Sequence, residues 1–458
     1  FTMIHIPEEH QIRQMVLALP ENGINICLGS DYVGEEKKGF LRQAMYWVDR
    51  HGLLGLHAGT KIVQVKEATT GKITRWGVFL FGLSATGKST WSCHQLGLDH
   101  RQGEGTFVIQ DDIVFLRSDG SALGSEANFF VKTDVDPQLQ EAMWWALTDK
   151  SALYENVMVD WRGEPDFLDE RLCANGRAVI RKDKLKIVRD KKGISIAYPS
   201  FDMPPVDELD GLIFAFITRR NTVMPFAMEL TPQEGVLAYL WGESTHSYAS
   251  QPEKAGESVR TVGTDPFIVG KRGVKVNRFR DIVMGLWEKY PHKVKFFQYN
   301  TGGVGEIIES LNGKKRMVRP ALRVPIDLMA AIQRGDLRGT NRYEKGRFGT
   351  KEIVSVEGYD LSPYQPEKFY DPETIEQIVA DIIKGRRAFT EEISDEGLDR
   401  EIVRWAEESL QIRVREQPTM ISLATPASPP TYQPPRSIFG EGVSDLYRPS
   451  RPLGWRIK

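Results

Sequence analysis

The clearest chemical signal in the sequence is a P-loop, the pattern in which two glycines separated by four residues precede a lysine and a hydroxyl residue. It is formed by Gly82, Leu83, Ser84, Ala85, Thr86, Gly87, Lys88 and Ser89. The glycines let backbone N–H groups converge on phosphate oxygens, and the helix that follows points its positive end at them. Lys88 can neutralise the β- and γ-phosphates, and Ser89 can bind Mg²⁺. Together with Thr90, this segment predicts a site for the phosphates of ATP or GTP.

Acidic and basic residues elsewhere in the chain could complete such a site. Asp111 and Asp112 follow the apolar segment 106–109, and a carboxylate at the end of a strand near a P-loop can hold the metal ion of a nucleotide. Most aspartate pairs are solvated turn residues, but this position favours a metal site. His57 and Lys38 stay open on spacing alone, because a lone histidine is more often structural and residues 34–38 could be a solvated helix start.

A P-loop requires a strand before it and a helix after it, and the sequence supplies both. Residues 74–81 are predicted to form the strand and residues 89–96 the helix. A turn at 70–72 joins this strand to a preceding one at 61–65. Residues 106–109 are predicted to be the strand that ends in the two aspartates.

Other segments have their own periodicity or turn signals. The predicted elements are strands at 25–29 and 212–218 and helices at 37–50, 372–384 and 399–410. The continuously apolar segment 212–218 is typical of a strand buried on both faces. The turn signal at 118–121 predicts a hairpin between strands at 113–116 and 129–132.

A basic segment and a proline-rich tail stand apart. Residues 181–193 contain seven lysines and arginines, which we interpret as an exposed hairpin with a basic turn. The alternative is contact with a polyanion or another subunit. Residues 416–458 are rich in proline and poor in large aliphatic residues, so they cannot build a core. We expect an extended arm that is disordered or wraps over a partner, which is either another protein or a second copy of the chain.

The composition bounds the class of protein. Of 458 residues, 41% are hydrophobic and 27% are charged, and the net charge of −2 gives no reason to expect nucleic acid or a membrane as the main partner. No apolar run approaches the ~20 residues of a membrane span, and residues 7–10 interrupt any secretory signal. The scattered Cys27, Cys93 and Cys173 argue against disulfides and a thiolate zinc site. We therefore expect a cytoplasmic protein.

Taken together, these segments resemble phosphoenolpyruvate carboxykinases, the ATP-dependent family more than the GTP-dependent one. The family motifs Tyr-x-Gly-Glu-x-Lys-Lys, Met-His-Cys-Ser-Ala-Asn, the P-loop and Gly-Asp-Asp match residues 32–38, 56–59, 82–89 and 110–112, in that order. Three more motifs, Glu-Gly-Gly-Cys-Tyr-Ala-Lys-Thr, Leu-Glu-Asn-Val and Asn-Thr-Arg, resemble residues 126–133, 154–157 and 175–177. Order and spacing hold from about residue 25 to residue 410.

The resemblance implies a metal role for five positions. Lys38, His57 and Asp112 fall where the family binds catalytic Mn²⁺, with the lysine acting as a neutral amine. Burial and a nearby cation would lower the pKa of that lysine enough for metal binding to complete its deprotonation. Ser89 falls on the Mg²⁺ hydroxyl, and Asp111 falls on the second acid near the metals.

The resemblance also implies roles for five cationic residues. Lys88 falls on the lysine that contacts the phosphates. Lys37, Lys132 and Arg177 fall on positions that contact substrate or the transferred phosphoryl group. Arg319, by a weaker alignment, falls near the site of the nucleotide base.

The activity implied by the resemblance is a step of gluconeogenesis on a small-molecule substrate. Oxaloacetate loses CO₂, and the resulting enolate takes the γ-phosphoryl group of ATP, which gives phosphoenolpyruvate and ADP. The implied cofactors are ATP, Mn²⁺ and Mg²⁺. Catalysis in such a site is mainly positioning and electrostatic stabilisation.

The implied fold is α/β: a mixed-sheet P-loop nucleotide domain with a smaller lobe and an extended C-terminal tail. The expected parts are the end of an N-terminal substrate-side domain, the first part of the nucleotide domain, the smaller lobe, the second part of the nucleotide domain and the tail. Their boundaries are 1–52, 53–170, 171–240, 241–415 and 416–458. The smaller lobe would bring Arg177 over the phosphates.

The sequence also departs from the family pattern. Ala85 replaces a loop glycine, Gln110 replaces the glycine before the aspartates, and a Ser-Tyr-Pro continuation is absent after Arg177. No counterpart of the family's Arg-Ser-Pro-Lys-Asp motif precedes Phe1, so either the first part is missing here or oxaloacetate binding is altered. Two other hypotheses therefore stay open. One is a kinase of the same fold that acts on another small molecule or a protein hydroxyl, and the other is a non-catalytic nucleotide-binding assembly protein that docks through the tail.

Overall fold

The computed structural model describes residues 1–8, 14–83, 86–171, 175–246, 252–311 and 314–415. These described residues form one compact unit. The tail predicted at 416–458 lies outside the described residues, so its extended arm and its partner stay predictions. Within the described ranges, none of the helices has the length and apolar character needed to cross a membrane. Cys27 and Cys93 are free and buried, while Cys173 is not among these residues.

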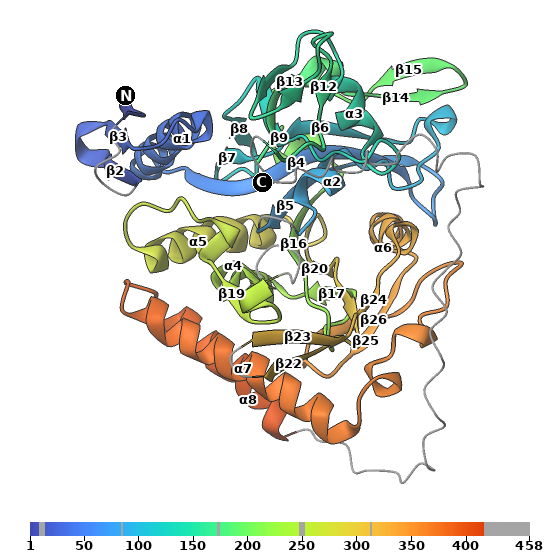
Figure 1. Cartoon of the computed structure of the whole chain (residues 1–458). Helices are drawn as coiled ribbons and strands as arrows, with labels where there is room; N and C mark the ends of the chain where they lie inside the picture. Colours follow the sequence, from blue (N-terminus) through green and yellow to red (C-terminus); the bar gives the residue numbers. More distant parts are fainter. Residues whose placement is uncertain (9–13, 84–85, 172–174, 247–251, 312–313, 416–458) are drawn as a thin grey trace, which may run out of the picture. The chain divides into compact units, whose positions relative to one another are not determined.

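A ten-stranded mixed sheet organises this unit (Figure 1). Its strands in spatial order are β25 (Arg342–Lys345), β26 (Lys351–Ser355), β17 (Ala227–Leu230), β20 (Val294–Asn300), β16 (Gly211–Thr218), β5 (Ile73–Gly82), β4 (Leu54–Lys66), β7 (Ile113–Leu116) and β8 (Ala122–Gly124). The tenth strand, β6 (Gly105–Gln110), pairs with β4. β16 runs parallel to β5 and β20, whereas β4 runs antiparallel to β5, β6 and β7. The predicted α/β class is therefore confirmed.

Helices cover both faces of the sheet, which explains its apolar central strands. All eight residues of β16 are buried, as predicted for 212–218. One face packs against α4 (Pro232–Trp241), α5 (Arg272–Lys289), α7 (Pro372–Ser394) and α8 (Arg400–Arg415). The other face packs against α2 (Lys88–Cys93) and α6 (Ile326–Arg338). The helices predicted at 372–384 and 399–410 are parts of α7 and α8, which extend further.

The N-terminal residues form a separate small sheet against a long helix. The strands lie in the order β1 (Thr2–Ile6), β3 (Ile24–Leu28) and β2 (Met15–Leu19). The helix α1 (Val33–Arg50) contacts this sheet and β4. It begins at Val33 rather than at the predicted Lys37, so that Lys37 and Lys38 lie in its second turn.

A second apolar core is formed mainly by residues 129–196. It contains α3 (Glu141–Leu147) and a three-stranded sheet of β10 (Leu153–Glu155), β13 (Arg177–Arg181) and β9 (Asn128–Lys132). The smaller lobe predicted at 171–240 stays a prediction. The structure places β16, β17 and α4, which fall inside that range, in the central sheet and its covering layer, because their side chains are apolar on more than one face.

Two turn predictions have different outcomes. The turn at 118–121 joins β7 to the short strand β8, and β9 pairs with β13, so the hairpin predicted between 113–116 and 129–132 is wrong. A three-residue strand such as β8 has too little alternation to be found in the sequence. The basic hairpin is confirmed as β14 (Lys186–Arg189) and β15 (Lys192–Ser195), joined through Asp190 and Lys191, both at positive φ.

A buried ion-pair network ties α7 to the body of the unit. Glu243 on β18 (Glu243–Thr245) lies 3.1 Å from Arg220, 3.5 Å from Arg260 and 3.1 Å from the Nε of Arg386 on α7. We expect Glu243→Gln to lower the free energy of unfolding by about 3–5 kcal/mol, because three guanidinium groups would lose their buried counter-charge. Chemical denaturation measures this change. Glu344→Gln, which removes an exposed ion pair with Arg342, should change it by less than about 1 kcal/mol, and equal effects of the two variants would contradict the assignment.

A second buried carboxylate predicts a pH dependence of stability. Asp336 on α6 accepts hydrogen bonds from Tyr299, Asn341 and Tyr343 at 2.7–2.8 Å. Burial raises the pKa of Asp336 to about 7. Between its ordinary pKa of about 4 and about 7, the folded protein keeps a proton that the unfolded chain has lost, so stability should fall as the pH rises, by up to about 4 kcal/mol. Asp336→Asn should flatten the dependence of thermal stability on pH across this range. An unchanged slope in the variant would show that Asp336 is not the cause of this dependence.

Candidate active site

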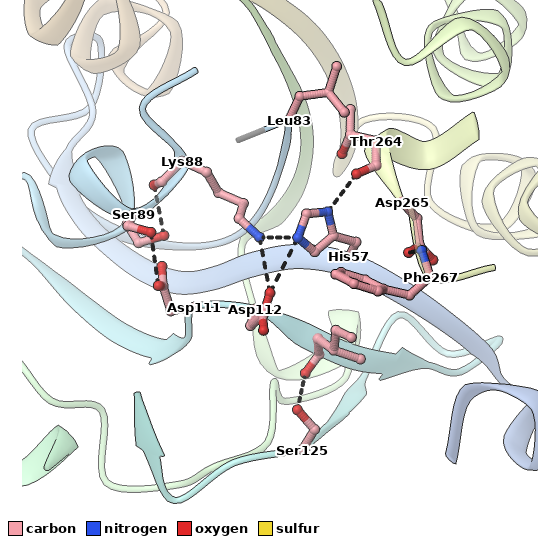
Figure 2. A network of polar contacts seen from close by, with 12 residues as sticks. His57, Leu83, Lys88, Ser89, Asp111, Asp112, Ser125, Thr264, Asp265 and Phe267 are labelled. Carbon is pink, nitrogen blue, oxygen red and sulfur yellow. Dashed lines mark hydrogen bonds and ion pairs between the residues drawn. The ribbon is translucent and has the colours of Figure 1, made fainter. Parts of the chain in front are cut away.

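Antiparallel pairing around β4 brings the predicted chemical residues together (Figure 2). His57 on β4 lies opposite Ile113, and Ala58 lies opposite Phe81, near the end of β5. The P-loop begins where β5 ends, and the two aspartates follow the end of β6, which also pairs with β4. His57 therefore lies between the P-loop and Asp112.

The carboxylate of Asp112 is the centre of the site. Lys38 donates a hydrogen bond to its Oδ2, and the Nζ of Lys37 lies 3.1 Å from the same oxygen. Its Oδ1 lies 3.3 Å from the Nε2 of His57 and 3.6 Å from the Nζ of Lys88. Burial opposes the charge on Asp112, but the positive charges of Lys88, Lys37 and Lys38 outweigh burial and hold its pKa well below the usual range. Asp112 is therefore ionised in the folded protein.

The adjacent lysines have different electrostatic surroundings. The Nζ of Lys37 also lies 2.7 Å from Glu126 Oε1. Burial works against its charge, but Asp112 and Glu126 outweigh burial and raise the pKa of Lys37. Burial, reinforced by Lys37 and Lys88, lowers the pKa of Lys38 in spite of Asp112. Lys38 is thus the lysine that loses its proton more readily, as a neutral amine ligand must.

His57 is oriented through both ring nitrogens. Its Nδ1 lies 2.6 Å from the carbonyl oxygen of Thr264, which can only accept, so Nδ1 carries the proton. The Nε2 lone pair then faces the Nζ of Lys88 at 3.0 Å. Burial and the Lys88 charge lower the pKa of His57, which keeps the imidazole neutral. The edge of the ring meets the ring of Phe267, with centroids 5.7 Å apart.

Ser89 and Asp111 form a second pair beside the first. The Ser89 hydroxyl donates to Asp111 Oδ2 at 2.9 Å. The other carboxylate oxygen, Oδ1, is buried and has no hydrogen-bond partner within the described residues. Burial raises the pKa of Asp111, although Lys88 opposes this shift. One Asp111 oxygen is therefore available to a further cation or donor.

This donor set fits a divalent cation. Nε2 of His57 and Oδ1 of Asp112 are both acceptors and both face a positive group, the Lys88 ammonium. Nitrogen and carboxylate oxygen donors at such a point suit a divalent metal. The parts of the chain that the structure describes contain no group of three or more His, Cys, Asp or Glu side chains that could bind a metal by themselves. The part of Lys38 as a third ligand stays a prediction.

The P-loop lies in the expected strand–loop–helix context. β5 ends at Gly82, and α2 begins at Lys88. Gly87 has a φ of +96°, a conformation that favours glycine. Ser84 and Ala85 lie outside the described residues, so the effect of the Ala85 replacement stays open.

Side chains on either side fix the loop. The Thr86 hydroxyl donates to the Leu83 carbonyl at 2.7 Å, and the Thr301 hydroxyl donates to the Thr86 carbonyl at 2.7 Å. On α2, the Thr90 hydroxyl accepts a hydrogen bond from Gln140 at 3.2 Å. The loop is thus closed on itself by Thr86 and tied to the residue after β20, while α2 is tied to the start of α3.

Comparison with known protein families shows to which family this arrangement of residues belongs. The family model described as phosphoenolpyruvate carboxykinase matches residues 1–361, a range that includes the P-loop, both aspartates, His57 and Lys38. The chain belongs to the phosphoenolpyruvate carboxykinase family.

Individual members of the family are also similar to the chain. The phosphoenolpyruvate carboxykinase (ATP) of Aeropyrum pernix is 32% identical over 371 residues, which cover 80% of this chain and 67% of that protein. The protein of the same name from Rhizobium etli is 25% identical over 359 residues, 75% of this chain and 57% of that protein. Phosphoenolpyruvate carboxykinase (ATP) 1 of Urochloa panicoides is 31% identical over 195 residues, 40% and 28% of the two chains. The segments matched by the chain thus cover between 28% and 67% of the length of these carboxykinases.

In this carboxykinase-family chain, the three-stranded sheet of β10, β13 and β9 carries further cations. Arg177 on β13 lies directly opposite Lys132 on β9. The ring of Phe130 has its centre 5.4 Å from Lys37 Nζ and 5.9 Å from the Arg177 guanidinium. Arg177 and Lys132 therefore lie side by side on this strand pair, and the Phe130 ring lies near both Arg177 and Lys37; their predicted roles stay predictions.

Arg319 makes structural contacts. Its Nε donates to the Gly305 carbonyl at 2.5 Å, and its Nη2 donates to the Phe369 carbonyl at 2.8 Å. The guanidinium also lies 5.5 Å and 5.3 Å from the ring centres of Phe369 and Tyr370. Its predicted place near the nucleotide base stays a prediction.

Sequence reasoning missed several residues of the carboxykinase site. Glu126 is the first residue of a recognised motif, but its pairing with Lys37 depends on distant backbone. Gln110, which replaces a family glycine, donates to the Glu126 carbonyl at 2.9 Å and so fixes this loop. Thr264 and Asp265 carry no local signal, although burial raises the pKa of Asp265 to about 7 and its Oδ2 has no partner in the described residues.

Proposed function

We propose that this chain catalyses the ATP-dependent decarboxylation and phosphorylation of oxaloacetate, which gives phosphoenolpyruvate, ADP and CO₂. The observation that carries the proposal is the convergence of Lys38, His57 and Lys88 on Asp112 in a member of the carboxykinase family. Membership of this family, whose similar proteins are named as ATP enzymes, supports ATP as the nucleotide and places the reaction in gluconeogenesis. The cytoplasmic location expected from the sequence stays a prediction.

Two groups of residues would hold the metals. Lys38, the Nε2 of His57 and Asp112 would hold Mn²⁺, and Ser89 with Asp111 would hold the Mg²⁺ that accompanies the nucleotide. When bound, these ions supply Lewis-acid stabilisation of negative charge on substrate and phosphate oxygens. The low pKa of Asp112 and the lowered pKa values of Lys38 and His57 all favour the protonation states that a metal requires.

The remaining cations would bind and orient the reacting molecules. Lys88 would contact the β- and γ-phosphates from the start of α2, while Lys37 and Arg177 approach from the other side of the site. Lys132, which is exposed, would meet the substrate from β9. These charges would offset the negative charge on the transferring phosphoryl group, so that catalysis is mainly positioning and electrostatic stabilisation.

A coupled assay tests the proposal and separates it from the two other hypotheses. The purified chain is supplied with Mg²⁺, Mn²⁺ and ATP or GTP, with and without oxaloacetate. We expect phosphoenolpyruvate only when oxaloacetate is present, with ATP preferred to GTP. ATP hydrolysis or transfer at one rate with and without oxaloacetate, and no phosphoenolpyruvate, would favour a kinase with another acceptor. Nucleotide binding without any turnover would favour an assembly protein.

A further inference from the structure

Thr264 has a backbone conformation that is unusual for its residue type. This β-branched residue has a φ of +54° and is 2% exposed. Such a conformation costs about 1–3 kcal/mol and persists only where the surroundings impose it, which is often at a functional site. We infer that Thr264 is a positioning residue for His57 and that its hydroxyl, with Thr218 and Gln298, forms a binding site for one buried water molecule. The link to metal binding rests on the proposed function.

The carbonyl group of Thr264 explains why this conformation matters. It accepts the hydrogen bond from His57 Nδ1 at 2.6 Å, as Figure 2 shows. This bond fixes the tautomer and the plane of the ring, so that Nε2 points toward Asp112 and Lys88. Hydrogen bonds of this kind to a metal-binding histidine commonly change metal affinity by 10–100-fold. A rotation of the Thr264 peptide would remove that constraint.

Close packing against the end of α4 holds the Thr264 backbone in place. The Thr264 N–H donates to the Thr261 carbonyl at 2.8 Å. A Cβ atom on Gly242, which ends α4, would lie 1.7 Å from that carbonyl oxygen and 2.8 Å from the Thr264 nitrogen. A Cβ on Gly263 would lie 2.6 Å from the ring of Tyr239 on α4. Close packing at Gly242 and Gly263 therefore holds the turn that ends at Thr264.

A small cavity with three polar side chains in its lining lies beside Thr264. Three of its lining residues, Thr218, Thr264 and Gln298, each have a buried side-chain atom without a hydrogen-bond partner in the described part of the chain. These atoms are two hydroxyl oxygens and the Gln298 Nε2. Buried polar groups are nearly always satisfied, and a cavity of about the size of one water molecule with three polar partners meets the needs of a bound water.

Charge around the cavity favours a water molecule over a cation. Glu243 also lines the cavity, but its oxygens are engaged by Arg220, Arg260 and Arg386. With three guanidinium groups for one carboxylate, no unpaired negative charge is left to attract a metal ion. A neutral ligand that can both donate and accept hydrogen bonds fits the three lining groups.

The same cavity connects His57 with the P-loop. The Thr218 carbonyl accepts a hydrogen bond from the Thr301 N–H at 2.9 Å. The Thr301 hydroxyl in turn donates to the Thr86 carbonyl in the P-loop at 2.7 Å. Water bound between Thr218 and Thr264 would therefore fix the Thr264 carbonyl, the partner of His57, relative to the end of β16 and, through Thr301, to the P-loop.

Two isosteric substitutions test the inference. Thr264→Val and Thr218→Val each remove one hydroxyl and keep the branched shape, and we expect each to weaken Mn²⁺ binding, measured by electron paramagnetic resonance, about 10-fold. Thr264→Ser, which keeps the hydroxyl, should have a Mn²⁺ affinity within about two-fold of the wild type. Thr350→Val is the matched control, because Thr350 is also buried and its hydroxyl donates to Met228 Sδ, away from this cavity. Unchanged Mn²⁺ affinity in both test variants would overturn the inference.

A second readout does not depend on metal. In ¹⁵N-labelled, metal-free protein, the His57 signals should show a proton on Nδ1, and both valine variants should shift the ring toward a mixture of tautomers. If the wild type binds no Mn²⁺ but the tautomer still shifts, the positioning role stands and the proposed metal chemistry fails. If the wild type binds Mn²⁺ through His57, as shown by loss in His57→Ala, and the tautomer is the same in all variants, the positioning role fails alone.

Discussion

Replacing Asp112 by asparagine should lower kcat/KM by about 10³-fold or more and abolish tight Mn²⁺ binding. Asp112 is the carboxylate that Lys37, Lys38 and Lys88 share, and its Oδ1 faces His57. Asparagine keeps the shape but removes the charge, so that a metal would lose its anionic ligand and the lysines would repel one another. Losing several kcal/mol of transition-state stabilisation corresponds to this factor. Steady-state kinetics and a Mn²⁺ titration of the same preparation measure both effects.

The control for Asp112→Asn is another aspartate that pairs with a cation away from the site. Asp183 lies 2.7 Å from Arg181, and both side chains are more than half exposed. Asp183→Asn should leave kinetics and metal binding unchanged within error. Activity in Asp112→Asn within ten-fold of the wild type would contradict the central place given to this carboxylate.

Replacing Lys88 by methionine should separate nucleotide chemistry from metal binding. Lys88 is the first residue of α2, and we propose that it contacts the phosphates, so its loss should lower kcat by about 10³-fold and weaken ATP binding. Its Nζ also lies 3.0 Å from His57 Nε2, so removal of this positive charge should leave Mn²⁺ affinity unchanged or higher. Calorimetry with ATP and a separate Mn²⁺ titration give the two affinities.

Lys72→Met, at an exposed lysine, is the matched control for Lys88→Met. Lys72 lies in the exposed turn between β4 and β5, and Lys72→Met should have wild-type nucleotide affinity and turnover. If Lys88→Met instead lost Mn²⁺ and ATP binding equally, a general disruption of the site would replace the specific phosphate role.

Local motifs made much of the nucleotide side of the site predictable. The strand before the P-loop, the helix after it and the aspartates after β6 were all found in sequence, because each signal lies within one short segment. The buried strand β16 and the helices α7 and α8 were found from apolar periodicity for the same reason.

Contacts between distant segments were not predictable from one sequence. Glu126 pairs with Lys37, and Thr264 orients His57, through backbone that only tertiary packing brings together. The partner of β9 was predicted wrongly, because a turn signal shows where a chain reverses but not which strand it then joins. In the same way, an apolar strand such as β16 does not reveal from its sequence to which sheet it belongs.

The most direct test of the account is ³¹P NMR of the chain with oxaloacetate, ATP, Mg²⁺ and Mn²⁺. The account predicts that the γ-phosphate signal of ATP declines while the phosphoenolpyruvate and ADP signals grow in equal amounts, and that Asp112→Asn abolishes this transfer. A γ-phosphate that stays on ATP, or appears only as inorganic phosphate in the presence of oxaloacetate, would contradict it.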